Sequence, residues 1–316
     1  MTNFATPWKE ALNEYFQEFL VFFPFLEIHA GIDWNRGCSF LDRELLPVAR
    51  DAEVRRQYVD CLVKVWLKDQ GEWGLIHVEV QATRERNFGW RMHAYNDRLR
   101  DKHKMTVVSL AVLGDDHPRW RPHQFSIERC GTPVGMRFPV VKILDYAEQG
   151  EMLRESRNPL AKVIMAHLIM LRTRHDPDAR CAAKLQLVQE IDKQGWRGEE
   201  RRRLLRVIDW MVVLLKPQEA TFWDRMREFE NKRRKPFMTT PERIEWRESW
   251  AKGFAEGRRE GLTESIALVL EIKFAAAGLR LMPEIRAIQE NAKLEAVLHA
   301  IRAAASPEEL RHVWTG

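Results

Sequence analysis

Residues 58–81 read YVDCLVKVWLKDQGEWGLIHVEVQ, two apolar runs on either side of a short polar break. Runs of this length that are rich in valine, isoleucine and aromatic residues predict β-strands, and Gly71 in the break predicts a turn that joins them into a hairpin. Each expected strand carries an acidic residue, Asp60 on the first and Glu79 on the second. Because a buried carboxylate without a partner is costly, such a pair usually shares a cation or a proton. The stretch therefore predicts a cation site, and metal-dependent cleavage of a phosphodiester is the first chemistry to consider.

Alternation along the two expected strands groups the polar residues. Side chains two residues apart on a strand share a face. His77, Glu79 and Gln81 would therefore point the same way from the second strand, and Asp60 and Lys64 would do so from the first. If the hairpin register brings these two faces together, Asp60, Lys64, Glu79 and Gln81 converge on one site.

Oxygen atoms dominate this expected cluster. The carboxylates of Asp60 and Glu79 and the backbone carbonyl of Val80 are hard oxygen ligands that suit Mg²⁺, for which Mn²⁺ could substitute. A bound Mg²⁺ would polarise a phosphoryl oxygen and lower the pKa of the attacking water. Lys64 or Gln81 would then position that water or stabilise the developing charge.

Composition narrows the class of protein without deciding its function. The chain has 316 residues and a formal net charge of +5, a mild basic bias that permits a nucleic-acid partner without requiring one. Its four cysteines are far apart and form no C-x-x-C pair, which argues against a zinc site or a disulfide framework and favours a reducing, cytoplasmic location. The N-terminus lacks the pattern of a signal peptide, and the apolar run 19–26 is too short to span a bilayer, so no membrane association is expected.

The remaining pattern predicts an α/β protein with an all-helical C-terminal part. The N-terminal half combines expected helices and strands with the hairpin: helices over residues 8–23, 39–46 (with Ser39 as the cap) and 87–102, and strands over 105–113 and 135–144. From about residue 148 only helical periodicity stands out: residues 160–172, 179–194, 199–215, 264–277 and 294–305. The glycines at 253, 257 and 261 would share one face of a densely charged helix. We interpret the chain as a core at 1–146, a helical extension at 147–235, a glycine-spaced linker helix at 236–262 and a small helical domain at 263–316.

Several short motifs occur in a recognisable order along residues 20–260. They are Ile32-Asp33-Trp34, Phe40-Leu41-Asp42-Arg43-Glu44-Leu45, Val59-Asp60-Cys61-Leu62-Val63-Lys64-Val65, Ile76-His77-Val78-Glu79-Val80-Gln81, Arg91-Met92-His93-Ala94-Tyr95-Asn96 and Leu113-Gly114-Asp115. An acidic residue on one strand and Glu-x-Lys on the next, with a helix before and a helix after, is the pattern of the PD-(D/E)XK nucleases. More closely, the ordered set resembles the Rpn family of recombination-promoting nucleases, which are often labelled transposases (YhgA-like).

This resemblance implies a PD-(D/E)XK-like mixed β-sheet core flanked by helices, and a function. The function would be that of a Mg²⁺-dependent DNA endonuclease of low sequence specificity, tied to recombination or transposition. Asp60 and Glu79 would be the metal ligands, and Glu44 a further acid of the metal site. Gln81 stands where the nuclease pattern has lysine. Because glutamine carries no charge to stabilise the transition state, this departure puts activity in doubt.

Other interpretations of the same residues remain open. Asp60 and Glu79 could instead form a structural ion pair, for instance with Lys64 or Arg91. Arg91 and Tyr95 lie four residues apart on the expected helix, where they could face the site and touch phosphate or form a surface pair.

Other functions also remain open. His77 has no partner at a ligand spacing and is expected to pack or to support the site. The alternative function is a degenerate nuclease fold that binds DNA or forms homo-oligomers through its C-terminal helices. A small-molecule enzyme is disfavoured, because the common phosphate-binding and nucleophile motifs are missing.

Overall fold

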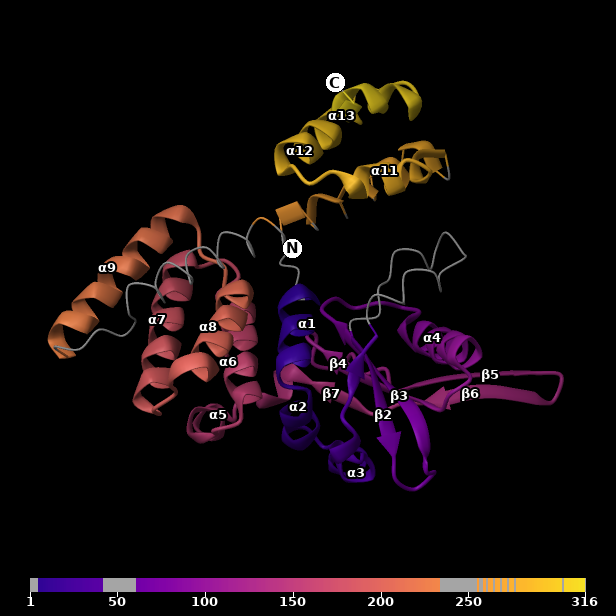
Figure 1. The fold of residues 1–316 in the computed structure, drawn as a ribbon. Coiled ribbons are helices and arrows are strands. Elements are labelled where there is room, and N and C mark those ends of the chain that lie inside the picture. The colour runs from indigo at the N-terminus through magenta and orange to yellow at the C-terminus, as the bar shows by residue number, and fades with distance from the viewer. Residues whose placement is uncertain are drawn as a thin grey trace. The chain divides into compact units, whose positions relative to one another are not determined.

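The computed structural model describes residues 5–41, 61–233 and 255–315, the last range without residues 256, 257, 260, 264, 268, 272, 276 and 303. These residues fall into two compact units, one within 4–239 and one within 240–316. The first unit holds a sheet and helices, and the second is helical where it is described. Figure 1 shows the elements of both units. The predicted mixed α/β class is confirmed.

A five-stranded mixed sheet forms the centre of the first unit, with the strand order β1-β2-β3-β4-β7. β1 and β3 each pair with β2 in antiparallel fashion, whereas β4 runs parallel to both β3 and β7. The strands are β1 (Ser39–Phe40), β2 (Cys61–Leu67), β3 (Glu72–Gln81), β4 (Val107–Leu113) and β7 (Val140–Lys142).

The predicted hairpin is confirmed as β2 and β3. Its turn contains Gly71 at φ +64°, a backbone conformation that glycine adopts without the steric cost of a side chain. The register pairs Cys61 with Val78 and Lys64 with Leu75. The helix expected to start at Ser39 is wrong at its beginning, because Ser39 and Phe40 form a strand that pairs with Lys64 and Val63. Pairing with β2 gives these two residues backbone hydrogen bonds, whereas the first N–H groups of a helix have no partner within the helix.

Helices cover both faces of the sheet. β3 is buried from Gly74 to Val80, so neither of its faces is open to solvent. The predicted helix after the hairpin is confirmed as α4 (Phe88–His103), and it packs on the face that carries Leu62 and Leu75. The helices α1 (Ala5–Glu14) and α2 (Phe16–Phe22) precede the sheet, and α1 contacts β2 and β3. The helix expected over 8–23 is therefore present but divided at Tyr15, whose φ and ψ are −134° and 37°.

A second, two-stranded sheet was not predicted. β5 (Gln124–Arg129) and β6 (Thr132–Arg137) form a hairpin whose residues are mostly exposed. In Figure 1 this hairpin extends away from the rest of the first unit. The single strand expected over 135–144 is instead the end of β6 and the separate strand β7. Phe138 and Pro139 connect the two-stranded sheet to the five-stranded sheet.

The N-terminal turn of α4 touches the start of β5 at Gly89. A β-carbon at this position would stand 2.5 Å from the backbone carbonyl oxygen of Gln124. We expect Gly89→Ala to lower the free energy of unfolding by about 1–3 kcal/mol, because backbone on both sides must move. Urea denaturation would measure the change, with Gly31→Ala as the control, since a β-carbon at Gly31 meets nothing within 4 Å. Equal stability of the two variants would contradict the close approach.

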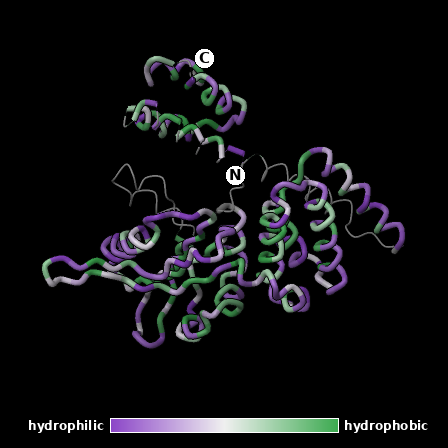
Figure 2. Tube along the Cα trace, turned by 180° about the vertical axis from the view of Figure 1, so that it is seen from behind, coloured by the Kyte–Doolittle hydropathy of each residue, from purple (hydrophilic) through white to green (hydrophobic). Residues whose placement is uncertain are grey.

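Helices follow the sheet, as predicted for the chain beyond about residue 148. Their bounds are α5 (Gly150–Glu155), α6 (Pro159–Arg172), α7 (Pro177–Lys193), α8 (Gly198–Met211) and α9 (Lys216–Arg233). α8 packs on α6 and α1, and Arg206 of α8 lies 2.7 Å from carboxylate oxygens of both Glu10 and Glu14 of α1. Figure 2 shows α9 as hydrophilic along most of its length. The helical extension thus belongs to the same compact unit as the sheet.

The second unit has a hydrophobic core of its own, which includes Ile266, Leu270, Ile285, Leu294 and Ile301. Its described elements include α11 (Met282–Ala287), α12 (Asn291–Ala300) and α13 (His312–Thr315). Most of the glycine-spaced linker predicted at 236–262 lies outside the described residues. Among the described residues, no helix combines the length and apolar character that a membrane span requires.

Candidate functional site

The candidate site lies on β3, on the face covered by α4. Leu75, His77, Glu79 and Gln81 alternate onto this face, and Leu75 packs there with Tyr95 of α4. The Glu79 residue is only 2% exposed and His77 is fully buried. The sequence places these polar groups on a central strand, and the packing of α4 removes them from solvent.

Arg91 of α4 is the cation of this site. Its guanidinium lies 3.2 Å from Glu79 Oε1 and 3.0 Å from Glu85 Oε2, and it donates a hydrogen bond to Gln81 Oε1. The Arg91 side chain is 7% exposed, so its pairing with Glu79 is a buried ion pair. Removing one partner of such a pair is strongly destabilising, since the other charge stays buried without compensation. Of the two cations considered for Glu79, Arg91 makes the ion pair.

The second carboxylate oxygen of Glu79 has no hydrogen bond to any described residue. Nε2 of His77 lies 3.5 Å from Glu79 Oε2. A buried carboxylate oxygen left in this way costs free energy, and a cation or another donor at this point would lower that cost.

His77 connects Glu79 to the neighbouring strand. Its Nδ1 lies 3.1 Å from Oγ of Ser109, its partner across the β3–β4 ladder. Asn96 of α4 donates to the same Oγ at 3.0 Å. His77 was expected to pack or to support the site, and it lies beside Glu79 on the same face of β3.

Gln81 has both ends of its amide engaged. Its Nε2 donates to the carbonyl oxygen of Thr83 at 2.7 Å, and its Oε1 accepts from Arg91. Gln81 is therefore held in place by its neighbours. The positive charge nearest to it is that of Arg91.

Lys64 does not join this cluster, contrary to the expectation that it would converge with Glu79. It pairs with Leu75 across the hairpin, four residues along β3 from Glu79, which is roughly 13 Å at the usual rise of a strand. Its Nζ lies 5.0 Å from the centroid of the Trp73 ring instead. The face was predicted correctly, but the register separates the two residues along it.

Of the other predicted site residues, some are buried and some lie outside the described residues. Tyr95 is 4% exposed and its ring meets that of His77 edge-on at 5.9 Å, so it faces the sheet and is not part of a surface pair. Val80 is buried, with its side chain on the face opposite Glu79. Asp60 and Glu44 lie outside the described residues. Within the described part of the chain, no three His, Cys, Asp or Glu side chains are grouped to hold a metal.

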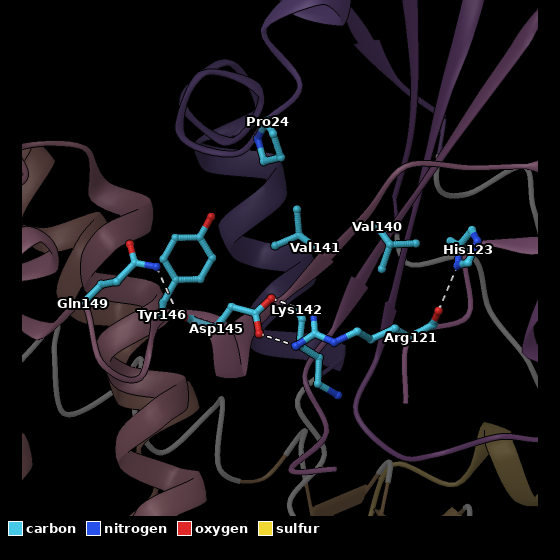
Figure 3. A pocket seen from close by; sticks show the side chains of 9 residues that line it. All are labelled: Pro24, Arg121, His123, Val140, Val141, Lys142, Asp145, Tyr146 and Gln149. Carbon is cyan, nitrogen blue, oxygen red and sulfur yellow. Dashed lines mark hydrogen bonds and ion pairs between the residues drawn. The ribbon is translucent and has the colours of Figure 1, made fainter. Parts of the chain in front are cut away.

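A separate pocket of about 280 Å³ lies beside β7 (Figure 3). Pro24, Val141 and Tyr146 contribute apolar wall, and an ion pair between Arg121 and Asp145 lies along it. The hydrogen bonds from Arg121 hold the pKa of the Asp145 carboxyl below its usual value. None of the residues predicted for the catalytic site lines this pocket, and its arginine is already neutralised.

Sequence reasoning did not single out Ser109 or Asn96. The available signal was a lone hydroxyl in the apolar run Val107-Val108-Ser109-Leu110-Ala111, where a buried polar side chain needs a partner. The partner comes from the parallel register of β3 and β4, which no local pattern specifies.

Comparison of the chain with protein-family models, with curated proteins and with solved structures finds no match.

Proposed function

We propose that this chain is a Mg²⁺-dependent DNA endonuclease of low sequence specificity, in which Asp60 and Glu79 hold the metal. The observation that carries the proposal is the buried carboxylate of Glu79, one of whose oxygens has no hydrogen bond to a described residue. Asp60 directly precedes Cys61, whose ladder partner Val78 is the neighbour of Glu79. Asp60 itself lies outside the described residues, and the proposal takes it as the second carboxylate because Mg²⁺ is bound by several oxygen ligands.

The order of elements supports the same proposal. A strand that follows the acidic residue, a strand with Glu-x-Gln, a helix and a parallel strand occur in sequence as β2, β3, α4 and β4. The helix that the Rpn resemblance implies after the two strands corresponds to α4, whereas residues 42–60, which would include the rest of the preceding helix and the first acid, lie outside the described residues. We therefore infer a role in DNA recombination or transposition, and a cytoplasmic location in keeping with four free cysteines.

Asp60, Glu79 and the carbonyl of Val80 would hold Mg²⁺ or Mn²⁺, which supplies Lewis-acid polarisation of the phosphate and a water of lowered pKa. The chain's own part is to orient these groups. Arg91 holds Glu79 and Gln81 together, and it keeps a positive charge beside the end of β3. We propose that the charge of Arg91, which contacts Gln81 directly, takes the place of the missing lysine.

Exposed arginines near α4 support DNA as the partner. Arg84, Arg86 and Arg119 are exposed and make no ion pair or hydrogen bond with another described residue. Trp90, in the first turn of α4, is 47% exposed. Unpaired arginines can neutralise backbone phosphates, and an exposed aromatic ring can stack on a base.

Plasmid nicking tests the proposal. We expect wild type to nick supercoiled plasmid with Mg²⁺ or Mn²⁺, and Asp60→Ala and Glu79→Gln to reduce the rate at least about 100-fold, since each removes a metal ligand. Glu79→Gln keeps the shape of the buried side chain. Glu72→Ala, an exposed acid at the far end of β3, is the matched control and should nick normally. An inactive wild type, or nicking equal in all four proteins, would reject the endonuclease.

The second candidate is a degenerate nuclease fold that binds DNA or forms homo-oligomers without cleaving it. It is favoured by one specific observation, the engagement of both Glu79 and Gln81 by Arg91. Binding of Mn²⁺, followed by electron paramagnetic resonance, separates the two functions. Binding to wild type that Asp60→Ala abolishes favours the endonuclease. Undetectable Mn²⁺ binding together with salt-dependent DNA binding favours the degenerate fold.

A further inference from the structure

Four polar side chains form a continuous line from helix α4 to the candidate acid. They are, in order, Asn96, Ser109, His77 and Glu79. The last three are at most 5% exposed, so water does not compete for their hydrogen bonds. In such surroundings the position of each proton is set by the neighbouring groups.

The direction of the line is fixed at its start by Asn96. Its Nδ2 lies 2.9 Å from the backbone carbonyl oxygen of Val107, which can only accept, so this end of the amide is the nitrogen. The second hydrogen of the same nitrogen points to Ser109 Oγ at 3.0 Å. Because Ser109 accepts this hydrogen, its own hydroxyl hydrogen is available for His77 Nδ1 at 3.1 Å.

The proton on His77 follows from that donation. If Nδ1 accepts from Ser109, the neutral ring carries its hydrogen on Nε2. That nitrogen lies 3.5 Å from Glu79 Oε2. With the opposite tautomer, a nitrogen lone pair would face the carboxylate and repel it.

We propose that Asn96 and Ser109 are positioning residues that fix His77 as its Nε2–H tautomer and so direct an N–H group at Glu79. Arg91 pairs with Oε1 of the same carboxylate, while Oε2 lies 3.5 Å from His77 Nε2 without a hydrogen bond, so the two oxygens face different partners. This resembles the way that outer residues orient ligands in metal sites, where their loss costs 10- to 100-fold in affinity or activity. An effect of these residues on catalysis rests on the proposed function, whereas the inferred tautomer of His77 does not.

Histidine tautomers can be read directly by long-range ¹H–¹⁵N correlation NMR of the full chain with labelled histidine, with His77→Gln used to assign the signal. We expect the Nε2–H pattern for His77 in wild type. Asn96→Asp keeps the shape of the side chain but replaces its donors by acceptors, so Ser109 should turn to Asp and His77 should change to Nδ1–H. Ser109→Ala should leave a mixture of both tautomers.

The matched control is Asn87→Asp, the same change at the start of the same helix, where the side chain makes no capping hydrogen bond. It should leave the His77 signal unchanged. A wild-type Nδ1–H tautomer, or an unchanged tautomer in both Asn96→Asp and Ser109→Ala, would overturn the proposal.

Nicking rates then test the link to catalysis. We expect Asn96→Asp and Ser109→Ala to lower kcat about 10- to 100-fold with an unchanged KM for DNA. A changed tautomer with an unchanged kcat would show that the line does not serve the reaction. If wild type itself does not nick plasmid, the proposed function fails. The NMR measurement of the His77 tautomer still tests whether Asn96 and Ser109 position His77.

Discussion

Replacing Lys184 with methionine is expected to lower the free energy of unfolding of the first unit by about 3–5 kcal/mol at pH 7.5 and by much less at pH 4. Lys184 Nζ lies 2.6 Å from Asp209 Oδ1 and donates to the carbonyl oxygen of Val212 at 2.9 Å. Both charged side chains are 3% exposed. Without the lysine, the carboxylate of Asp209 would remain buried with no cation beside it.

The pH dependence follows from the protonation of Asp209. Burial raises the pKa of its carboxyl to about 6 even though Lys184 favours the charged form. A raised pKa means that the folded protein binds the proton more tightly, so the contribution of Asp209 to stability is present at low pH and is lost as pH rises through about 6. In the Lys184→Met variant the acid can be neutral at pH 4, which removes the penalty of a buried charge.

Urea denaturation at pH 4 and pH 7.5 measures this effect, with hydrogen exchange in α7 and α8 to locate it. Lys193→Met makes the same change at an exposed position of α7 and serves as the control. The double variant Lys184→Met, Asp209→Leu should regain most of the lost stability, because no charge remains buried. A loss of the same size at both pH values would contradict the role assigned to Asp209.

Acidification from pH 6.5 to pH 4 is expected to cost about 3 kcal/mol of stability through His167 alone. Trp8 donates to Nδ1 of His167 at 3.0 Å, so the ring carries its hydrogen on Nε2, which lies 2.7 Å from the carbonyl oxygen of Gly114. The side chain thus ties α1 and α6 to the end of β4. Burial lowers its pKa to about 4.

The effect of pH on stability through His167 has the opposite sign to the effect through Asp209. A lowered histidine pKa means that the unfolded chain binds the proton more tightly between pH 4 and 6.5, so stability falls as pH falls through this range. Asp209 gains stability as pH falls from about 6, so the two effects partly cancel in wild type. The cancellation predicts a shallow pH dependence that a variant of either residue would expose.

His167→Gln tests this prediction, because glutamine can accept from Trp8 and donate to Gly114 but does not titrate. We expect its stability to rise, relative to wild type, by about 3 kcal/mol between pH 6.5 and pH 4, measured by urea denaturation. His175→Gln, at an exposed position just after α6, is the control and should follow wild type. Parallel pH profiles of wild type and His167→Gln would disprove the assignment.

The elements that the sequence predicted correctly are those with strong local patterns. Two β-branched runs separated by a glycine turn became the β2–β3 hairpin, and an apolar run became β4. The hairpin of β5 and β6 was not predicted, although residues 124–129 (QFSIER) alternate between polar and apolar side chains. Its strands are mostly exposed, so no long apolar run marks them in the sequence. Ser39 was expected to cap a helix but pairs with β2, since an edge strand depends on a neighbour distant in the chain.

The candidate site shows the same division between local pattern and tertiary contact. The alternation of strand side chains was enough to group His77, Glu79 and Gln81 on one face, because it depends only on backbone geometry. Alternation could not identify the cation that pairs with Glu79. Lys64 lies on the predicted hairpin with the two acids, yet Arg91 from the following helix makes the ion pair. Strand register and helix packing arise from contacts between segments far apart in sequence. They place Arg91, and not Lys64, next to Glu79.

The chain's local patterns thus establish its α/β class, the hairpin and the face on which the polar residues lie. Only the folded structure decides that Glu79 is buried, that Arg91 holds it, and that Asn96 and Ser109 lie behind His77. The physical reason is that burial and ion pairing depend on which surfaces meet, whereas strand alternation and turns depend on neighbouring residues alone.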